Sequence, residues 1–161
     1  MSTAPGPDRG EEYPAEDIVV TFDAKRCLHS GECVRGLPEV FDTDRRPWID
    51  PTRVPAEQVA EVIRHCPSGA LHYTPTGGAP EMPTHPTRVY VVDGGPLVLR
   101  GHIQVTMPDG THRHETRAAL CRCGSTGNVP FCDRSAGCAL TGRDWGQSDP
   151  PGRPAAEPPG T

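Results

Sequence analysis

The most reactive side chains in this 161-residue chain are its seven cysteines. They fall into two separated sets. The first set comprises Cys27, Cys33 and Cys66, and the second comprises Cys121, Cys123, Cys132 and Cys138. An odd number of cysteines argues against a closed framework of disulfides. The stretch Met1–Glu16 also lacks the apolar segment of a secretory signal. We therefore predict a reducing, cytoplasmic setting, where clustered thiols more often ligate metals or carry redox chemistry.

The spacing of the first set suits an iron–sulfur cluster. Cys27 and Cys33 lie in one short loop, and the distant Cys66 is followed by Pro67. Iron–sulfur clusters are held by thiolates, and closely spaced cysteines allow one loop to wrap the cluster with its backbone amides. A cysteine from another element then closes the site. The alternative is three unconnected structural or surface cysteines.

The residues around this set resemble a known family. Segments 22–42 (FDAKRCLHSGECVRGLPEVFD) and 64–73 (RHCPSGALHY) are similar to the divergent single-cluster ferredoxin domain, over essentially all of 17–74. The resemblance implies that the three cysteines bind a cluster. Ser30 stands where ordinary single-cluster ferredoxins have a middle cysteine. Three thiols suit a [3Fe–4S] cluster, whereas a [4Fe–4S] cluster needs another ligand. Ser30 is in register for that role, and the adjacent His29 has the better ligand chemistry near neutral pH.

Residues 121–138 (CRCGSTGNVPFCDRSAGC) resemble the CDGSH iron–sulfur domain, whose pattern is C-x-C-x2-[ST]-x3-P-x-C-D-x2-H. Six positions are in register: Cys121, Cys123, Thr126, Pro130, Cys132 and Asp133. The family holds a [2Fe–2S] cluster with three cysteines and one histidine, so the resemblance implies the same cluster here.

The histidine position of this motif is occupied by Ala136. A methyl group cannot ligate iron, so another residue must supply the fourth bond or the cluster is lost. Cys138 is the first candidate ligand, and His112 and His114 are weaker ones. We expect Asp133 to cap the turn after Cys132 and to act on the cluster only indirectly.

Proline and glycine divide the chain into five segments. We predict a disordered arm (1–16), a first module (17–74), a Pro/Gly-rich linker (75–86), a second module (87–146) and a disordered tail (147–161). With 34% hydrophobic residues, 20 prolines and 18 glycines, neither module can build a large core, and each needs a staple such as a metal. The predicted fold class is α+β, with a ferredoxin-like α+β module followed by a β-rich CDGSH-type module.

Local patterns predict the elements of each module. In the first, we expect a strand over 18–22, a short helix near 32–35, a short strand at 48–49, a helix from Pro55 to about His65, and a strand over 70–73. In the second, we expect strands near 88–92, 97–99, 102–107 and 113–119, with a hairpin turn at 108–110.

These features favour a non-enzymatic electron carrier or redox module, because no catalytic constellation is apparent. Acidic residues in 21–23 and 42–44 are candidates for docking a basic reductase or oxidase. A second hypothesis is an iron–sulfur sensor or transfer protein. A third is a zinc-stabilised binding module, although C-x-C fits structural zinc poorly.

The net charge of -5 and the lack of a basic stripe argue against nucleic-acid binding. No apolar run approaches the ~20 residues of a membrane helix. The oligomeric state is left open.

Overall fold

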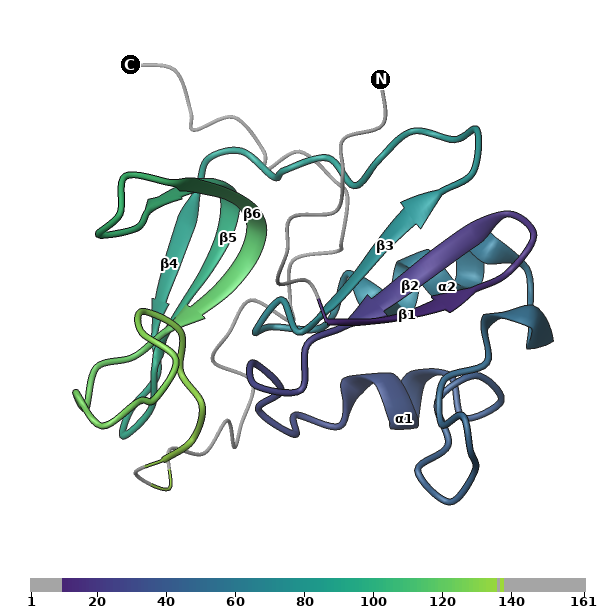
Figure 1. Ribbon diagram of the computed structural model, residues 1–161, viewed down its shortest axis with the longest axis horizontal. Coiled ribbons are helices and arrows are strands. Elements are labelled where there is room, and N and C mark those ends of the chain that lie inside the picture. Colours follow the sequence, from purple (N-terminus) through teal and green to yellow (C-terminus); the bar gives the residue numbers. More distant parts are fainter. Residues whose placement is uncertain (1–9, 136, 138–161) are drawn as a thin grey trace, which may run out of the picture.

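The structure is a computed structural model that describes residues 10–135 and 137. It consists of two small modules, mostly β with few helices (Figure 1). Each module contains one three-stranded antiparallel sheet. None of the described helices is long and apolar enough to cross a membrane.

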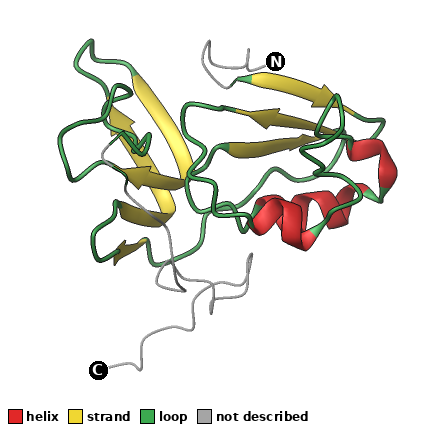
Figure 2. Cartoon of the chain, turned by 90° about the horizontal axis from the view of Figure 1, so that it is seen from below, coloured by secondary structure: helices red, strands yellow, loops and turns green. Residues whose placement is uncertain are grey.

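The sheet of the first module has the order β1-β2-β3 and is covered by helices on one side (Figure 2). Its strands are β1 (Glu11–Pro14), β2 (Ile18–Phe22) and β3 (Leu71–Pro75). The helices between β2 and β3 are α1 (Glu32–Gly36), the 3-10 turn η1 (Pro51–Arg53) and α2 (Ala56–Ile63). α2 follows Pro55 and buries one apolar face, formed by Val59, Ala60 and Ile63, against the sheet. The expected short strand at 48–49 is reduced to a single bridge between Phe41 and Ile49.

The predicted disordered arm is wrong for residues 11–14, which form β1. Glu11 and Glu12 are exposed, whereas Tyr13 is buried in the core opposite Val20. β1 forms because its backbone pairs with the edge of β2 and because the ring of Tyr13 is buried in the core. Its acidic residues and Pro14 are typical of a sheet edge, where they limit further pairing.

The second module is a meander of β4 (Arg88–Val91), β5 (Leu97–Thr106) and β6 (His112–Leu120). The two predicted strands at 97–99 and 102–107 are one continuous strand, β5. It carries a register shift between Arg100 and Ile103. Gly101 lies inside this irregularity with φ +147°, and a Cβ there would approach Thr87 to 2.5 Å. A bulge at a glycine therefore bends β5 without ending it.

The connection between the modules has neither helix nor strand from residue 76 to residue 87. It is nevertheless anchored, because Glu81 binds Arg117 of β6 through two hydrogen bonds of 2.9 and 3.0 Å. β6 is an edge strand of its sheet and lies next to the first module (Figure 1). The two modules therefore meet along this strand.

Candidate metal centres

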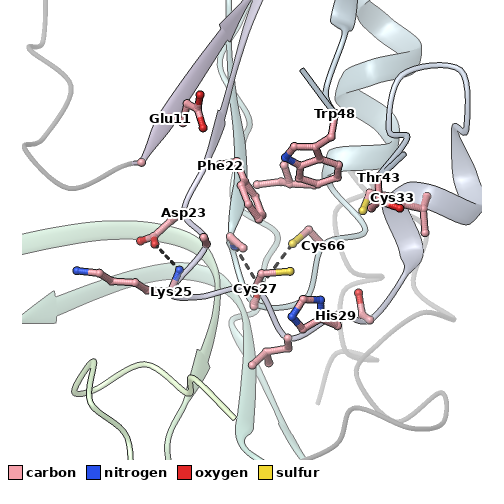
Figure 3. Close-up of a pocket in the computed structure, with 18 of the residues that line it drawn as sticks. Glu11, Phe22, Asp23, Lys25, Cys27, His29, Cys33, Thr43, Trp48 and Cys66 are labelled. Atoms are coloured by element: carbon pink, nitrogen blue, oxygen red, sulfur yellow. Dashed lines mark hydrogen bonds between the residues drawn. The ribbon is translucent and has the colours of Figure 1, made fainter. Parts of the chain in front are cut away.

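Cys27, Cys33 and Cys66 line one cavity of about 820 Å³ in the first module. Figure 3 shows their side chains around a common space, with His29 and Trp48 on its walls. Each cysteine comes from a different place in the fold. Cys27 lies in the loop after β2, Cys33 lies on α1, and Cys66 follows α2. The fold therefore brings together the three cysteines that the sequence singled out.

Backbone turns fix the loop that carries Cys27. The amides of Arg26 and Cys27 donate to the carbonyls of Asp23 and Ala24, at 3.1 and 3.4 Å. Gly31 then adopts a left-handed conformation with φ +79° immediately before α1, where a Cβ would lie 2.4 Å from the Arg35 guanidinium. On the opposite side of the cavity, the Sγ of Cys66 lies 3.5 Å from the Ser68 hydroxyl.

Burial raises the pKa of two thiols in this cavity, those of Cys27 and Cys33. Burial, followed by the neighbouring thiols of Cys66 and Cys27, raises the pKa of Cys33 to about 12. Burial also raises the pKa of Cys27, partly offset by the backbone amide of His29 and by the charge of Arg134. Three half-buried thiols around one cavity suit a positively charged iron centre, which would stabilise their thiolates. The donor set and the cavity therefore fit an iron–sulfur cluster.

His29 and Ser30 also line the cavity. His29 is exposed and has a positive φ of 55°. The carbonyl of Ser30 accepts a hydrogen bond of 2.8 Å from Arg35. His29 as a fourth ligand stays a prediction.

The second cysteine set begins where β6 ends. The Sγ atoms of Cys121 and Cys123 lie 3.5 Å apart, and the Ser125 amide points at Cys123 Sγ from 3.4 Å. Desolvation acts to raise the pKa of Cys121. The hydrogen bond with Cys123 and the backbone amides of Gly124 and Thr126 outweigh it and lower that pKa. Cys121 is therefore partly prepared to act as a thiolate.

Cys132 is brought beside this pair by a short return of the chain. Leu120 and Phe131 form an isolated antiparallel bridge, the Cys121 amide donates to Pro130, and the Cys132 amide donates to Ala119. Because side chains alternate along a strand, this pairing places Cys121 and Cys132 on the same face as diagonal neighbours. Cys123 is exposed, whereas Cys132 is only 3% exposed. The site thus extends from the surface into the core.

Asp133 organises the loop around these cysteines. Its carboxylate accepts amide hydrogen bonds of 2.9 Å from both Gly127 and Ser135, and it also contacts the Ser135 hydroxyl. Thr126 donates to the carbonyl of Phe131 at 2.6 Å. These contacts agree with a turn-capping role for Asp133, and its influence on a cluster stays a prediction.

The predicted fourth ligands of the second site have different outcomes. Cys138, like Ala136, lies outside the described residues. His112 and His114 lie at the start of β6, whereas Cys121 follows its end. A strand of this length separates them by about 25 Å, so these two histidines are not ligands of this site. Among residues 10–135 and 137, no three cysteine, histidine, aspartate or glutamate side chains converge closely enough to hold a single metal ion.

Family comparisons match both modules of the chain. A model described as a divergent 4Fe-4S mono-cluster matches residues 13–76, and an iron-binding zinc finger of CDGSH type matches residues 94–135. The first half is also 49% identical over 61 residues to the uncharacterized protein YjdI of Escherichia coli strain K12. This match spans 38% of the chain and 80% of that relative, and the O157:H7 protein matches equally. Through its first half, the chain belongs to the divergent 4Fe-4S mono-cluster family. No solved structure matches the chain significantly. The two predicted resemblances are confirmed, in the predicted order.

Buried charged residues that no local sequence pattern predicts join the mono-cluster module to the CDGSH-type module. Arg26 donates to the Glu115 carboxylate at 2.9 Å, and His72 Nε2 lies 3.3 Å from its other oxygen. Arg117 is 2% exposed and donates to the carbonyls of Cys66 and Leu71, each at 2.8 Å. Arg26 and Glu115 are 89 positions apart, so no local pattern could have paired them.

This junction predicts a loss of stability in acid. Burial lowers the pKa of His72 below 6.5, with Glu115 opposing that shift. Burial acts to raise the pKa of Glu115, but His72 and Arg26 lower it from 4.5 to about 2. For both His72 and Glu115, the pKa in the folded protein lies below the pKa in the unfolded chain. The free energy of unfolding therefore falls as the pH drops below 6.5 through His72, and again between about 4.5 and 2 through Glu115, the latter by roughly 3 kcal/mol.

Urea unfolding of the full chain at a series of pH values tests this prediction. In His72→Gln, the fall in the free energy of unfolding just below pH 6.5 should be smaller than in the wild type. The fall below pH 4.5, assigned to Glu115, should persist. An exposed control, His102→Gln, should follow the wild-type curve. A His72→Gln curve that matches the wild type throughout would contradict the assignment.

Proposed function

We propose that this protein is a non-enzymatic electron carrier. It would hold a [3Fe–4S] or [4Fe–4S] cluster in a ferredoxin-like α+β first module and a [2Fe–2S] cluster in the second. The observation that carries the proposal is the meeting of Cys27, Cys33 and Cys66 around one cavity. The thiol pair of the CDGSH-type loop supports the second site. Such clusters accept and release single electrons.

The chain's own residues would hold the first cluster and limit its contact with water. Phe22 and Trp48 line the cavity and pack edge to face, with ring centroids 4.9 Å apart. Apolar walls of this kind lower the local dielectric and help set a reduction potential. Asp23 lies at the cavity, and Asp42 and Asp44 flank the lining residue Thr43. We propose that they contact a basic reductase or oxidase.

Cluster transfer or sensing is the second candidate function, and the exposure of Cys123 favours it. A cluster ligand in contact with solvent can be reached by a thiol of an acceptor protein. A zinc-stabilised module is less well supported. A tetrahedral zinc–thiolate site places sulfurs within about 4 Å of one another around one ion, and the described residues form no such group of three.

Repeated redox cycling separates a carrier from a transfer protein. The anaerobically purified chain should be reduced with dithionite and reoxidised several times, with iron and acid-labile sulfide measured after each cycle. A carrier keeps its visible spectrum and its iron through the cycles. In a parallel incubation with an apo-ferredoxin acceptor, the iron should stay with this chain. Delivery of iron and sulfide to the acceptor would favour transfer, and a colourless zinc-loaded protein would contradict both functions.

A further inference from the structure

The neighbours of Cys27 reach directly into the second module. Leu28 is 4% exposed and belongs to a small core with Val92, Val98, Ala119 and Cys132, all from the second module. A candidate ligand of the second site therefore shares a packed core with the residue that follows a candidate ligand of the first.

A second contact joins the residues on the other side of each cysteine. The Arg26 guanidinium lies over the Phe131 ring, 4.1 Å from its centroid. Arg26 precedes Cys27, and Phe131 precedes Cys132. Arg26 also donates to the backbone carbonyl of Arg117 at 3.4 Å. Two contacts, one apolar from Leu28 and one cationic from Arg26, therefore hold residues 26–28 against residues 131–132.

The strand that supports the second site also holds the first site in place. Arg117, on β6, donates to the carbonyl of Cys66 at 2.8 Å. Strand alternation places Arg117, Ala119 and Cys121 on one face of β6, and Cys132 lies on that same face. At least one cysteine of each set, Cys66 and Cys132, is therefore hydrogen-bonded to β6.

We propose that the two cysteine sites form one electron path within the chain, crossing from Cys27 to Cys132 through the packed side chain of Leu28. The inference rests on the proposed function. With clusters bound, Cys27, Cys33 and Cys66 would hold a centre that gives up one electron while the centre held at the second site would accept it, or the reverse. No bond forms or breaks. A one-electron reductant from solution supplies the electron, and the difference in reduction potential sets its direction.

On this path, Leu28 is the side chain that connects the loop of Cys27 with the core that contains Cys132. Electron tunnelling weakens steeply with distance and more steeply across empty space than through packed atoms. Truncation to alanine removes buried atoms, and the surrounding core closes such cavities only in part. The Leu28→Ala variant should therefore move electrons between the sites about tenfold more slowly, because a void replaces part of the path.

Rapid mixing with one reducing equivalent of dithionite per chain, followed by freeze-quenching and electron paramagnetic resonance, tests the path. The wild type should redistribute the electron between the two cluster signals at a rate independent of protein concentration. Leu28→Ala should slow that step. The same substitution at Leu99, which packs against a different hydrophobic core of the second module, should not slow that step. A rate proportional to protein concentration, an electron confined to the site first reduced, or an unaffected Leu28→Ala rate would overturn the proposal.

Two further measurements keep the outcome interpretable. Iron and sulfide assays on each sample distinguish the two proposals: a wild type without clusters rejects the carrier function, whereas full clusters without redistribution reject only the internal path. If Leu28→Ala does not fold, the paramagnetic resonance spectrum of the fully reduced wild type tests the path instead. Its two paramagnetic centres should broaden or split each other's signals, and two independent, unperturbed signals would overturn the path.

Discussion

Replacing Arg117 with methionine should lower the free energy of unfolding of the full chain by about 3–5 kcal/mol. The side chain of Arg117 is buried and donates four hydrogen bonds of 2.8 to 3.0 Å, two to the Glu81 carboxylate and one each to the carbonyls of Cys66 and Leu71. Methionine fills similar space without donors. The substitution leaves the Glu81 carboxylate and two buried carbonyls without their donors, and an uncompensated buried charge is strongly unfavourable. Urea unfolding followed by intrinsic fluorescence measures the loss.

Two further variants give this prediction its control and its mechanism. Arg53→Met removes an exposed ion pair with Asp50, with the arginine side chain 55% exposed, and should cost less than about 1 kcal/mol. The double variant Arg117→Met with Glu81→Leu removes both charges together and should recover part of the lost stability. A double variant less stable than Arg117→Met alone would contradict the ion-pair account.

Replacing Cys66 with alanine should empty the first site and leave the second occupied. Cys66 follows α2 and supplies the third thiol of the cavity. Its removal leaves only Cys27, in the loop after β2, and Cys33, on α1. Two thiols cannot satisfy a cluster that needs three or four ligands. Iron, sulfide and the paramagnetic signal of the first cluster should be lost, while a [2Fe–2S] signal remains.

The reciprocal variant Cys123→Ala should lose the second signal and keep the first. Thr43 lines the same cavity as Cys66 but has no thiol. The control variant Thr43→Ala should therefore retain both clusters. Equal loss of both signals in Cys66→Ala would contradict two separate sites and point instead to a general loss of folding.

Local patterns predicted the elements that carry the first site. The β-branched run of β2 and the apolar spacing of α2 identify those elements without tertiary information. The candidate cysteines Cys27 and Cys33 stood out in the same way because they lie close together in the sequence, whereas only the fold shows that the distant Cys66 joins them. β1 was missed, because Glu11, Glu12 and Pro14 have low strand propensity. Only the edge of β2 and the burial of Tyr13 make that segment a strand.

The junction between the modules was beyond sequence reasoning. Arginines flank many surface loops, and nothing in their spacing distinguishes the exposed Arg53 from the buried Arg117. Their roles depend on partners such as Glu81 and Glu115, which only the folded chain brings into contact. The same holds for Leu28, an ordinary loop residue in the sequence that enters the core of the second module.

We propose that this one chain holds two separate iron–sulfur centres. Low-temperature electron paramagnetic resonance on the anaerobically purified full chain, with iron and acid-labile sulfide measured on the same sample, tests this directly. Two distinct signals are expected. The first site should give a signal in the oxidised protein if it holds a [3Fe–4S] centre, or after reduction if it holds a [4Fe–4S] centre, and the second site should give a [2Fe–2S] signal after reduction. The iron and sulfide contents should match the sum of the two centres. A single signal with iron for one centre, or zinc in place of iron, would contradict the presence of two iron–sulfur centres.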